Sequence, residues 1–117
     1  MKNKKMKALI IEDNKLVQEI TKVFVEEAGY KVDMANDGES GLTLLKKKSY
    51  QIVLIDIGLP GISGYEVIKK FQTWNKKAVI IVMTAHADDE LKNKCLNIGC
   101  VVVLDKPFDA EILKKYL

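Results

Sequence analysis

The sequence contains no arginine: all 19 of its basic residues are lysines, and the formal net charge is +3. Without arginine the chain has no planar, bidentate side chain for guanine edges or phosphates. The lysine runs at 46–48, 69–70 and 76–77 lie apart, and we interpret them as solvated helix ends, where lysine also suits the helix dipole. We therefore expect no direct binding to nucleic acid.

Long apolar runs are absent as well. No stretch approaches the length of a membrane-spanning helix, so we expect no membrane association. The basic segment 2–7 is followed by only four apolar residues, Ala8–Ile11, which is too short for the apolar region of a signal peptide. We expect a cytoplasmic protein. The length of 117 residues, 48% of them hydrophobic, suits a single domain with a full core.

Cysteine and histidine are scarce, with two and one in the chain. Cys95 and Cys100 are separated by four residues and have no second pair, which is a poor pattern for zinc. Cys95 lies on an apolar helical stripe with Leu91 and Ile98, whereas Cys100 precedes an apolar run. We interpret both as buried or half-buried thiols rather than metal ligands or a disulfide.

What the chain does contain is four apolar runs of strand length, each followed by polar or charged residues. The runs are 8–11, 52–55, 79–83 and 101–104. Continuous apolar runs separated by helical stretches are typical of a buried parallel sheet. The segment 30–35 alternates partly and predicts a fifth, shorter strand between the first and second of these runs.

The stretches between the strands carry helix signals. Asn14 can cap a helix over 15–28, in which Leu16, Ile20 and Phe24 recur at helical spacing. The other expected helices run from Gly38 to about 48, from the Ser63–Glu66 capping box to near 74, from the Asp88 cap to about 98, and over 109–117.

Five strand–helix units of this size predict an α/β fold. Because crossovers between parallel strands are right-handed, the units fit a doubly wound, five-stranded parallel sheet of flavodoxin type, (βα)5, with strand order 2-1-3-4-5. We expect residues 1–117 to form this one domain. The chain ends soon after the last helix begins, so we expect no output domain.

The polar residues after the strands should meet at one edge of the sheet. Ligands of such sheets bind outside the carboxyl ends of the strands, and the first and third strands are neighbours in this order. Asp13 and Asp56 should therefore lie side by side, with Glu12, Thr84 and Lys106 nearby. Carboxylates repel one another there, and a hard divalent cation such as Mg²⁺ relieves that repulsion.

Four motifs at these strand ends resemble the response-regulator receiver domain of two-component signalling, and the likeness covers essentially the whole chain. They are Ile11-Glu12-Asp13-Asn14, the segment 56–64, Thr84-Ala85 and Lys106-Pro107-Phe108. The resemblance implies a signalling switch that accepts a phosphoryl group from a histidine kinase or a histidine phosphotransfer protein. It then changes its binding to a downstream protein that the sequence does not name. The resemblance also implies that the domain is not an enzyme for other substrates and catalyses only its own phosphorylation and dephosphorylation.

The resemblance also implies a role for each site residue. Asp56 is the phosphorylated nucleophile. Mg²⁺ is held by Asp13, Asp56 and the Gly58 backbone carbonyl, and Glu12 completes the acidic cluster. Lys106, aimed by a cis bond to Pro107, and the Thr84 hydroxyl bind the phosphoryl group, for which the small Ala85 leaves room.

Three positions depart from the usual pattern or add to it. Val103 occupies the position of an aromatic residue whose ring normally swings inward when the switch operates. Valine has no ring, so this chain cannot make that movement. Gly58 stands where a larger side chain is common, which leaves the site more open. His86 lies two residues after Thr84, and with Gly58 it could modulate dephosphorylation; a solvent-exposed imidazole without a role is the alternative.

Other interpretations fit fewer of these residues. Taken one at a time, these residues also have purely structural interpretations: Asp13 as a helix cap, Thr84 as the end of a strand and Lys106-Pro107 as a turn. A haloacid-dehalogenase-type phosphatase needs a second aspartate at position 58, where this chain has glycine. A flavin or nucleotide carrier needs a phosphate loop after the first strand, where Glu12 and Asp13 would repel phosphate. A receiver-like binding module without phosphorylation would lack part of the acidic trio, the threonine or the lysine, and here all are present.

Overall fold

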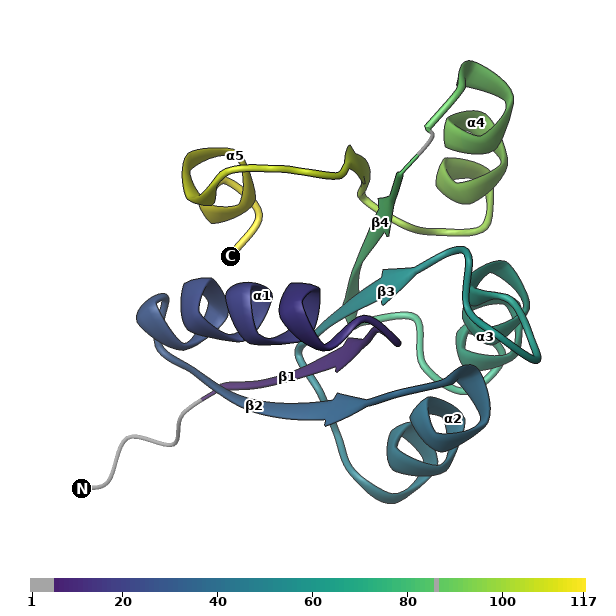
Figure 1. The fold of residues 1–117 in the computed structure, drawn as a ribbon. Coiled ribbons are helices and arrows are strands. Elements are labelled where there is room, and N and C mark those ends of the chain that lie inside the picture. Colours follow the sequence, from purple (N-terminus) through teal and green to yellow (C-terminus); the bar gives the residue numbers. More distant parts are fainter. Residues whose placement is uncertain (1–5, 86) are drawn as a thin grey trace.

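The computed structural model describes residues 6–85 and 87–117, in which strands and helices alternate along the chain (Figure 1). In chain order the elements are β1 (Met6–Ile11), α1 (Lys15–Glu27), β2 (Tyr30–Ala35), α2 (Gly38–Lys47), β3 (Ile52–Asp56), α3 (Gly64–Gln72), β4 (Val79–Thr84), α4 (Asp89–Asn97), β5 (Val102–Asp105) and α5 (Ala110–Lys114). Within the described residues, no helix has the length and apolar character needed to cross a bilayer.

The five strands form one parallel sheet in the order β2-β1-β3-β4-β5, which confirms the predicted fold class and strand order. In the β1–β3 ladder Ile11 pairs with Ile55, so Glu12 and Asp56 come next on two adjacent strands. In the β4–β5 ladder Thr84 pairs with Asp105, so Lys106 comes directly after that pair. The register therefore brings all the predicted site residues of these strands to one edge of the sheet.

Alternate residues of each strand enter two separate hydrophobic layers. Leu9 and Ile11 of β1 pack with α2, α3 and α4 on one face, while Ala8 and Ile10 pack with α1 and α5 on the other. In Figure 1, α1 and α5 lie on one side of the sheet and α2 and α3 lie on the opposite side. The central strands are covered on both faces, as expected for a parallel sheet with continuous apolar strands.

The predicted helix caps are confirmed. The side chains of Asn14, Asp37, Ser63 and Asp88 each accept a hydrogen bond from a backbone N–H in the first turn of the following helix. These bonds satisfy amides that have no partner within the helix, and they fix where each helix begins.

Several element boundaries differ from the sequence-based expectation. β1 begins at Met6, because its ladder with β2 extends two residues before the apolar run. β5 runs through Asp105 rather than ending at Leu104, because its ladder with β4 continues to the Thr84–Asp105 pair. The last helix is confined to Ala110–Lys114, with Asp109 as its cap.

The orientation of α1 also differs from its apolar pattern. Leu16 and Ile20 are 68% and 46% exposed, whereas Gln18 and Thr21 are buried. Gln18 is held inward because its amide nitrogen donates hydrogen bonds to the backbone carbonyl of Glu12 and to the Asn36 side chain. This rotation leaves part of the apolar surface of α1 facing solvent.

Candidate functional site

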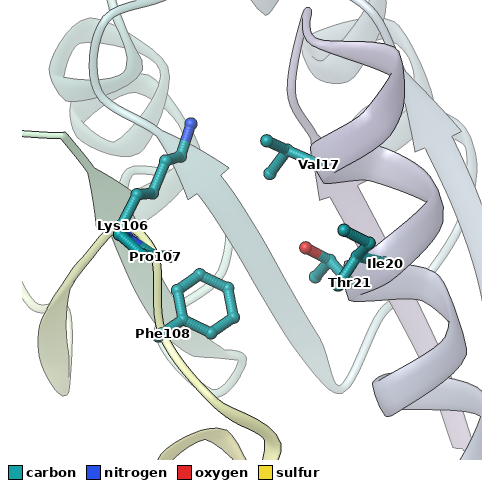
Figure 2. Close-up of a pocket in the computed structure, with 6 residues that line it drawn as sticks. All are labelled: Val17, Ile20, Thr21, Lys106, Pro107 and Phe108. Atoms are coloured by element: carbon teal, nitrogen blue, oxygen red, sulfur yellow. The ribbon is translucent and has the colours of Figure 1, made fainter.

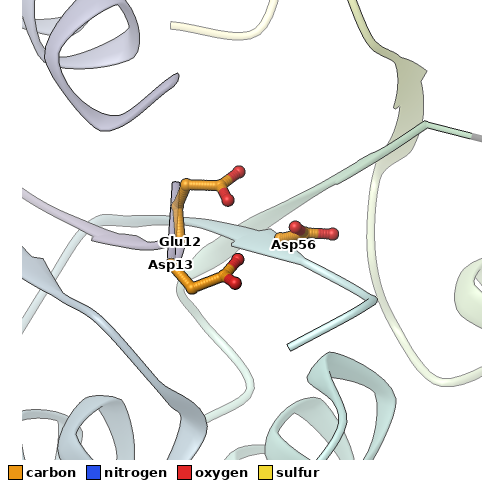
Figure 3. Close-up of side chains that lie close together, drawn as sticks. All are labelled: Glu12, Asp13 and Asp56. Carbon is orange, nitrogen blue, oxygen red and sulfur yellow. The ribbon is translucent and has the colours of Figure 1, made fainter. Parts of the chain in front are cut away.

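Three carboxylates gather at the carboxyl ends of β1 and β3 (Figure 3). One oxygen atom from each of Glu12, Asp13 and Asp56 lies within 4.8 Å of the others. Glu12 is fully buried and Asp56 is nearly so, whereas Asp13 is exposed. The predicted acidic cluster therefore forms, and it opens to solvent on the side of Asp13.

Lys106 supplies the positive charge of this cluster. Its ammonium group donates hydrogen bonds to Oε1 of Glu12 and, at 3.0 Å, to Oδ2 of Asp56. The peptide bond to Pro107 is cis, as the family resemblance implied. Burial by itself would lower the pKa of Lys106, but the hydrogen bonds to Glu12 and Asp56 raise it above its usual value, so the side chain stays charged.

Glu12 occupies the innermost position of the cluster. Burial raises its pKa, while the hydrogen bonds from Lys106 and from the backbone N–H of Asn14 act in the opposite direction. Gln18 supports the same segment from α1 through the Glu12 carbonyl. We did not predict this role for Gln18, although a polar residue inside an otherwise apolar helical face is a signal that could have indicated it.

Asp56 is oriented by the β3–α3 loop as well as by Lys106. The backbone N–H of Gly58 donates to Oδ1 of Asp56 at 2.9 Å. Among the described residues, a Cβ atom at Gly58 would meet only that same oxygen, at 3.7 Å, which is an ordinary contact. Gly64, at the start of α3, lies directly against the backbone of Asp56, which fixes the path of the loop.

Thr84 is the last residue of β4, and Ala85 follows it. Thr84 is buried and its backbone carbonyl accepts a hydrogen bond from the Lys106 N–H at 2.7 Å, while Ala85 is exposed. Farther along the same loop, the Ala87 N–H donates to the Asp105 carboxylate at 3.0 Å. His86, which we predicted as a modulator of dephosphorylation, lies outside the described residues.

Val103 is nearly buried in the layer formed by α2, α3 and α4, where its neighbours in the same cluster include Cys95 and Val82. This strand position thus faces the α4 side of the sheet. An aliphatic side chain packs there in place of the aromatic ring that is usual in the family.

The donor set of the acidic cluster fits a hard divalent cation. All three side-chain donors are carboxylate oxygens, which Mg²⁺ prefers to nitrogen or sulfur. The cluster combines a solvent-open side at Asp13 with a buried side at Glu12, so an ion could bind there and keep some of its water ligands.

A cavity of about 370 Å³ lies next to the site, between α1 and the segment after β5 (Figure 2). Its lining is mainly apolar and consists of Val17, Ile20, Thr21, Lys106, Pro107 and Phe108. Among the described residues, the buried hydroxyl of Thr21 has no hydrogen-bond partner. The exposed Ile20 of α1 and the stem of Lys106 thus share one surface beside Asp56.

Curated proteins with similar sequences match most of this chain. Regulatory protein VanRB of Enterococcus faecalis is 34% identical over 110 residues, which are 94% of this chain and 50% of that protein. The chain spans half or less of the length of this and other curated relatives, among them a cyclic di-GMP phosphodiesterase of Thermotoga maritima, of which it covers 29%.

Solved structures agree with the sequence comparison. A response regulator receiver domain protein from Methanospirillum hungatei superposes with a TM-score of 0.90 at 27% identity, over 96% of this chain and 90% of that one. The receiver domain of a Saccharomyces cerevisiae response regulator, crystallised with a histidine phosphotransfer protein, superposes with a TM-score of 0.84 at 28% identity, over 95% and 85%. The family model of the response regulator receiver domain matches residues 8–117. The chain therefore belongs to the response regulator receiver domains of two-component systems.

Proposed function

We propose that this domain is a signalling switch that is phosphorylated on Asp56. The observation that carries the proposal is the position of the Asp56 carboxylate, which lies within the acidic cluster and 3.0 Å from the Lys106 ammonium group. A carboxylate in this setting can act as a nucleophile toward phosphorus, because adjacent positive charge stabilises the phosphoryl oxygens during transfer.

In the transfer step, a side-chain oxygen of Asp56 forms a bond to phosphorus while the bond from phosphorus to the donor's nitrogen breaks. The donor is the phosphohistidine of a histidine kinase or a histidine phosphotransfer protein, and the departing imidazole takes up a proton. Lys106 is already hydrogen-bonded to Asp56, so only a small movement brings its ammonium group to a phosphoryl oxygen. Glu12, also bound to Lys106, keeps that side chain at the site throughout.

Mg²⁺ would be held by Glu12, Asp13, Asp56 and the backbone carbonyl of Gly58. When bound, the ion offsets the charge of the carboxylates and of the phosphoryl oxygens. Asp13 is the exposed member and would face the incoming donor.

The hydroxyl of Thr84 and the small side chain of Ala85 would border the phosphoryl group, and their loop leads directly into α4. Movement of that loop would alter the binding of a downstream protein.

The surface of α1 beside the site suits a protein donor. Leu16, Ile20 and Val23 are exposed on this helix, and the apolar cavity next to Lys106 continues the same surface. The yeast complex of a receiver domain with a phosphotransfer protein supports a donor of this class. A helix that covered these residues would remove apolar surface from water close to Asp56.

Intact-mass measurement after incubation with acetyl phosphate and Mg²⁺ tests the proposal. We expect one phosphoryl adduct, which hydroxylamine removes, in the wild-type protein and in Asp89→Asn, a matched substitution at an exposed residue of α4. Asp56→Asn should carry none, and EDTA should suppress the adduct in the wild type. An equal yield on Asp56→Asn would contradict phosphorylation of Asp56, and an equal yield in EDTA would contradict the role of the metal.

A further inference from the structure

The C-terminus of α4 places the chain's two cysteines at the two ends of one tight turn. Gly99 has a positive φ of 110°, and its N–H donates to the Leu96 carbonyl at 3.1 Å. The N–H of Cys100 donates to the carbonyl of Cys95, also at 3.1 Å. This pair of bonds is the Schellman arrangement, in which the side chains at the positions of Cys95 and Cys100 pack against each other.

The two side chains are free thiols that belong to the same buried cluster. Cys95 is fully buried and Cys100 is 5% exposed, so the turn holds both thiols together inside the protein. The chain contains no other cysteine, so each thiol has the other as its only intramolecular thiol partner. The contact that usually closes such a turn through two apolar groups is made here by two oxidisable ones.

We propose that Cys95 and Cys100 are a redox modification site that forms a reversible disulfide with each other. A low-molecular-weight disulfide is the oxidant. One cysteine thiolate attacks a sulfur of the oxidant, which forms a mixed disulfide and releases one small thiolate. The second cysteine then attacks the protein-bound sulfur, closes the Cys95–Cys100 bond and releases the second small thiol. The two protein thiol protons end on the two released thiols, so the exchange is balanced.

Burial decides when this reaction can begin. It raises the pKa of both thiols, that of Cys100 to about 12, and it blocks the approach of an oxidant. The first attack therefore requires the last turn of α4 to open. The second attack is intramolecular and follows as the turn closes. The site should thus react slowly, and mixed disulfides should not accumulate.

The bond would join α4 to the segment that leads into β5. Both cysteines belong to the same buried layer as Val103, so oxidation would stiffen the junction of these two elements. This inference is independent of the phosphorylation of Asp56, because no group of the acidic cluster takes part in it.

Intact-mass measurement tests the proposal. The native protein is incubated with excess oxidised glutathione and then alkylated before its mass is measured. We expect the wild type to lose two hydrogen atoms per chain without dimer formation, and dithiothreitol to restore the original mass. Cys95→Ala and Cys100→Ala lack a second thiol, so neither can give that product. Thiols retained after prolonged incubation, once the mass no longer changes with time, would overturn the proposal, as would two bound glutathiones or covalent dimers.

Amide hydrogen exchange of the wild type gives a second test that needs no variant. The Gly99 and Cys100 amides donate the two bonds of the turn, so oxidation should slow their exchange several-fold. Equal exchange in both forms would show that the bond does not close this turn.

Discussion

The carboxylate of Asp105 accepts a hydrogen bond from the backbone N–H of Ala87, at a distance of 3.0 Å, and so joins the end of β5 to the β4–α4 loop. Asp105 pairs with Thr84 in the sheet, and the next residue, Lys106, donates its N–H to the Thr84 carbonyl. The loop after Thr84 is therefore attached to β5 through polar contacts.

Asp105→Ala should loosen the β4–α4 loop. The substitution removes one exposed hydrogen bond, which typically contributes about 1 kcal/mol or less. We expect faster hydrogen exchange at the Ala87 amide, with little change in global stability. Asp105→Asn keeps an oxygen acceptor at the same place, so its exchange rate should stay close to that of the wild type. Equal exchange rates in Asp105→Ala and the wild type would show that the contact does not restrain the loop.

Phosphorylation should move the loop after β4 more than β5. The Thr84 hydroxyl would move toward the phosphoryl group, and α4 begins a few residues later, so it would move too. Val103 has no ring that could change rotamer. Such a switch biases two populated states rather than creating a new one. Amide chemical shifts on addition of beryllofluoride, a phosphoryl mimic, test this. Changes centred on Val103 and absent between Thr84 and Leu91 would contradict it.

The strands were predictable because each is a short-range signal, and the strand order then followed from the right-handed crossovers of parallel strand–helix units. Runs such as Ile52–Ile55 are apolar without interruption, and each ends at a polar residue that the sheet must place at its edge. The helix caps were equally predictable, since Asn14 and Asp88 act within three residues of themselves.

Features that depend on distant partners were not predictable in the same way. The rotation of α1 depends on Gln18, whose hydrogen bonds reach Glu12 and Asn36. Apolar spacing alone therefore gave no reason to expect Leu16 at the surface. The attachment of Asp105 to Ala87 also joins residues far apart in the chain, and the contact between Cys95 and Cys100 required the geometry of the helix end.

Gly64→Ala should be destabilising, whereas Gly58→Ala should be tolerated. A methyl group at Gly64 would overlap the backbone carbonyl oxygen of Asp56 and lie 2.8 Å from the Cα of Ile57, so the loop must shift. Overpacking of this kind costs about 1–3 kcal/mol. At Gly58 the nearest atom is Oδ1 of Asp56 at 3.7 Å, an ordinary contact. Urea unfolding of both variants provides the comparison, and equal stabilities would contradict the packing described for Gly64.

The Tyr50–Asp33 hydrogen bond should make stability depend on acid pH. The hydroxyl of buried Tyr50 donates to Oδ2 of Asp33 at 2.6 Å, and this bond, aided by Lys48, lowers the pKa of Asp33 below its ordinary 3.8. A lowered pKa in the folded state contributes stability that is complete above the unfolded value and lost as pH falls through the folded value.

Tyr50→Phe should therefore lower the free energy of unfolding by about 1 kcal/mol near neutral pH, with exposed Tyr116→Phe as the matched control. Below about pH 4 the difference from the wild type should shrink, because Asp33 becomes protonated in both proteins. Thermal unfolding across this range provides the measurement. A difference that stays constant with pH would assign the effect to packing rather than to the hydrogen bond.

Asp56, and neither Glu12 nor Asp13, should receive the phosphoryl group. Borohydride reduces an acyl phosphate to an alcohol, which converts a phosphorylated aspartate into homoserine at its position in the chain. After treatment with acetyl phosphate and Mg²⁺ followed by borohydride, tandem mass spectrometry of the digested protein should find homoserine at position 56 and unmodified residues at 12 and 13. A reduced residue at position 12 or 13, with Asp56 intact, would contradict phosphorylation of Asp56.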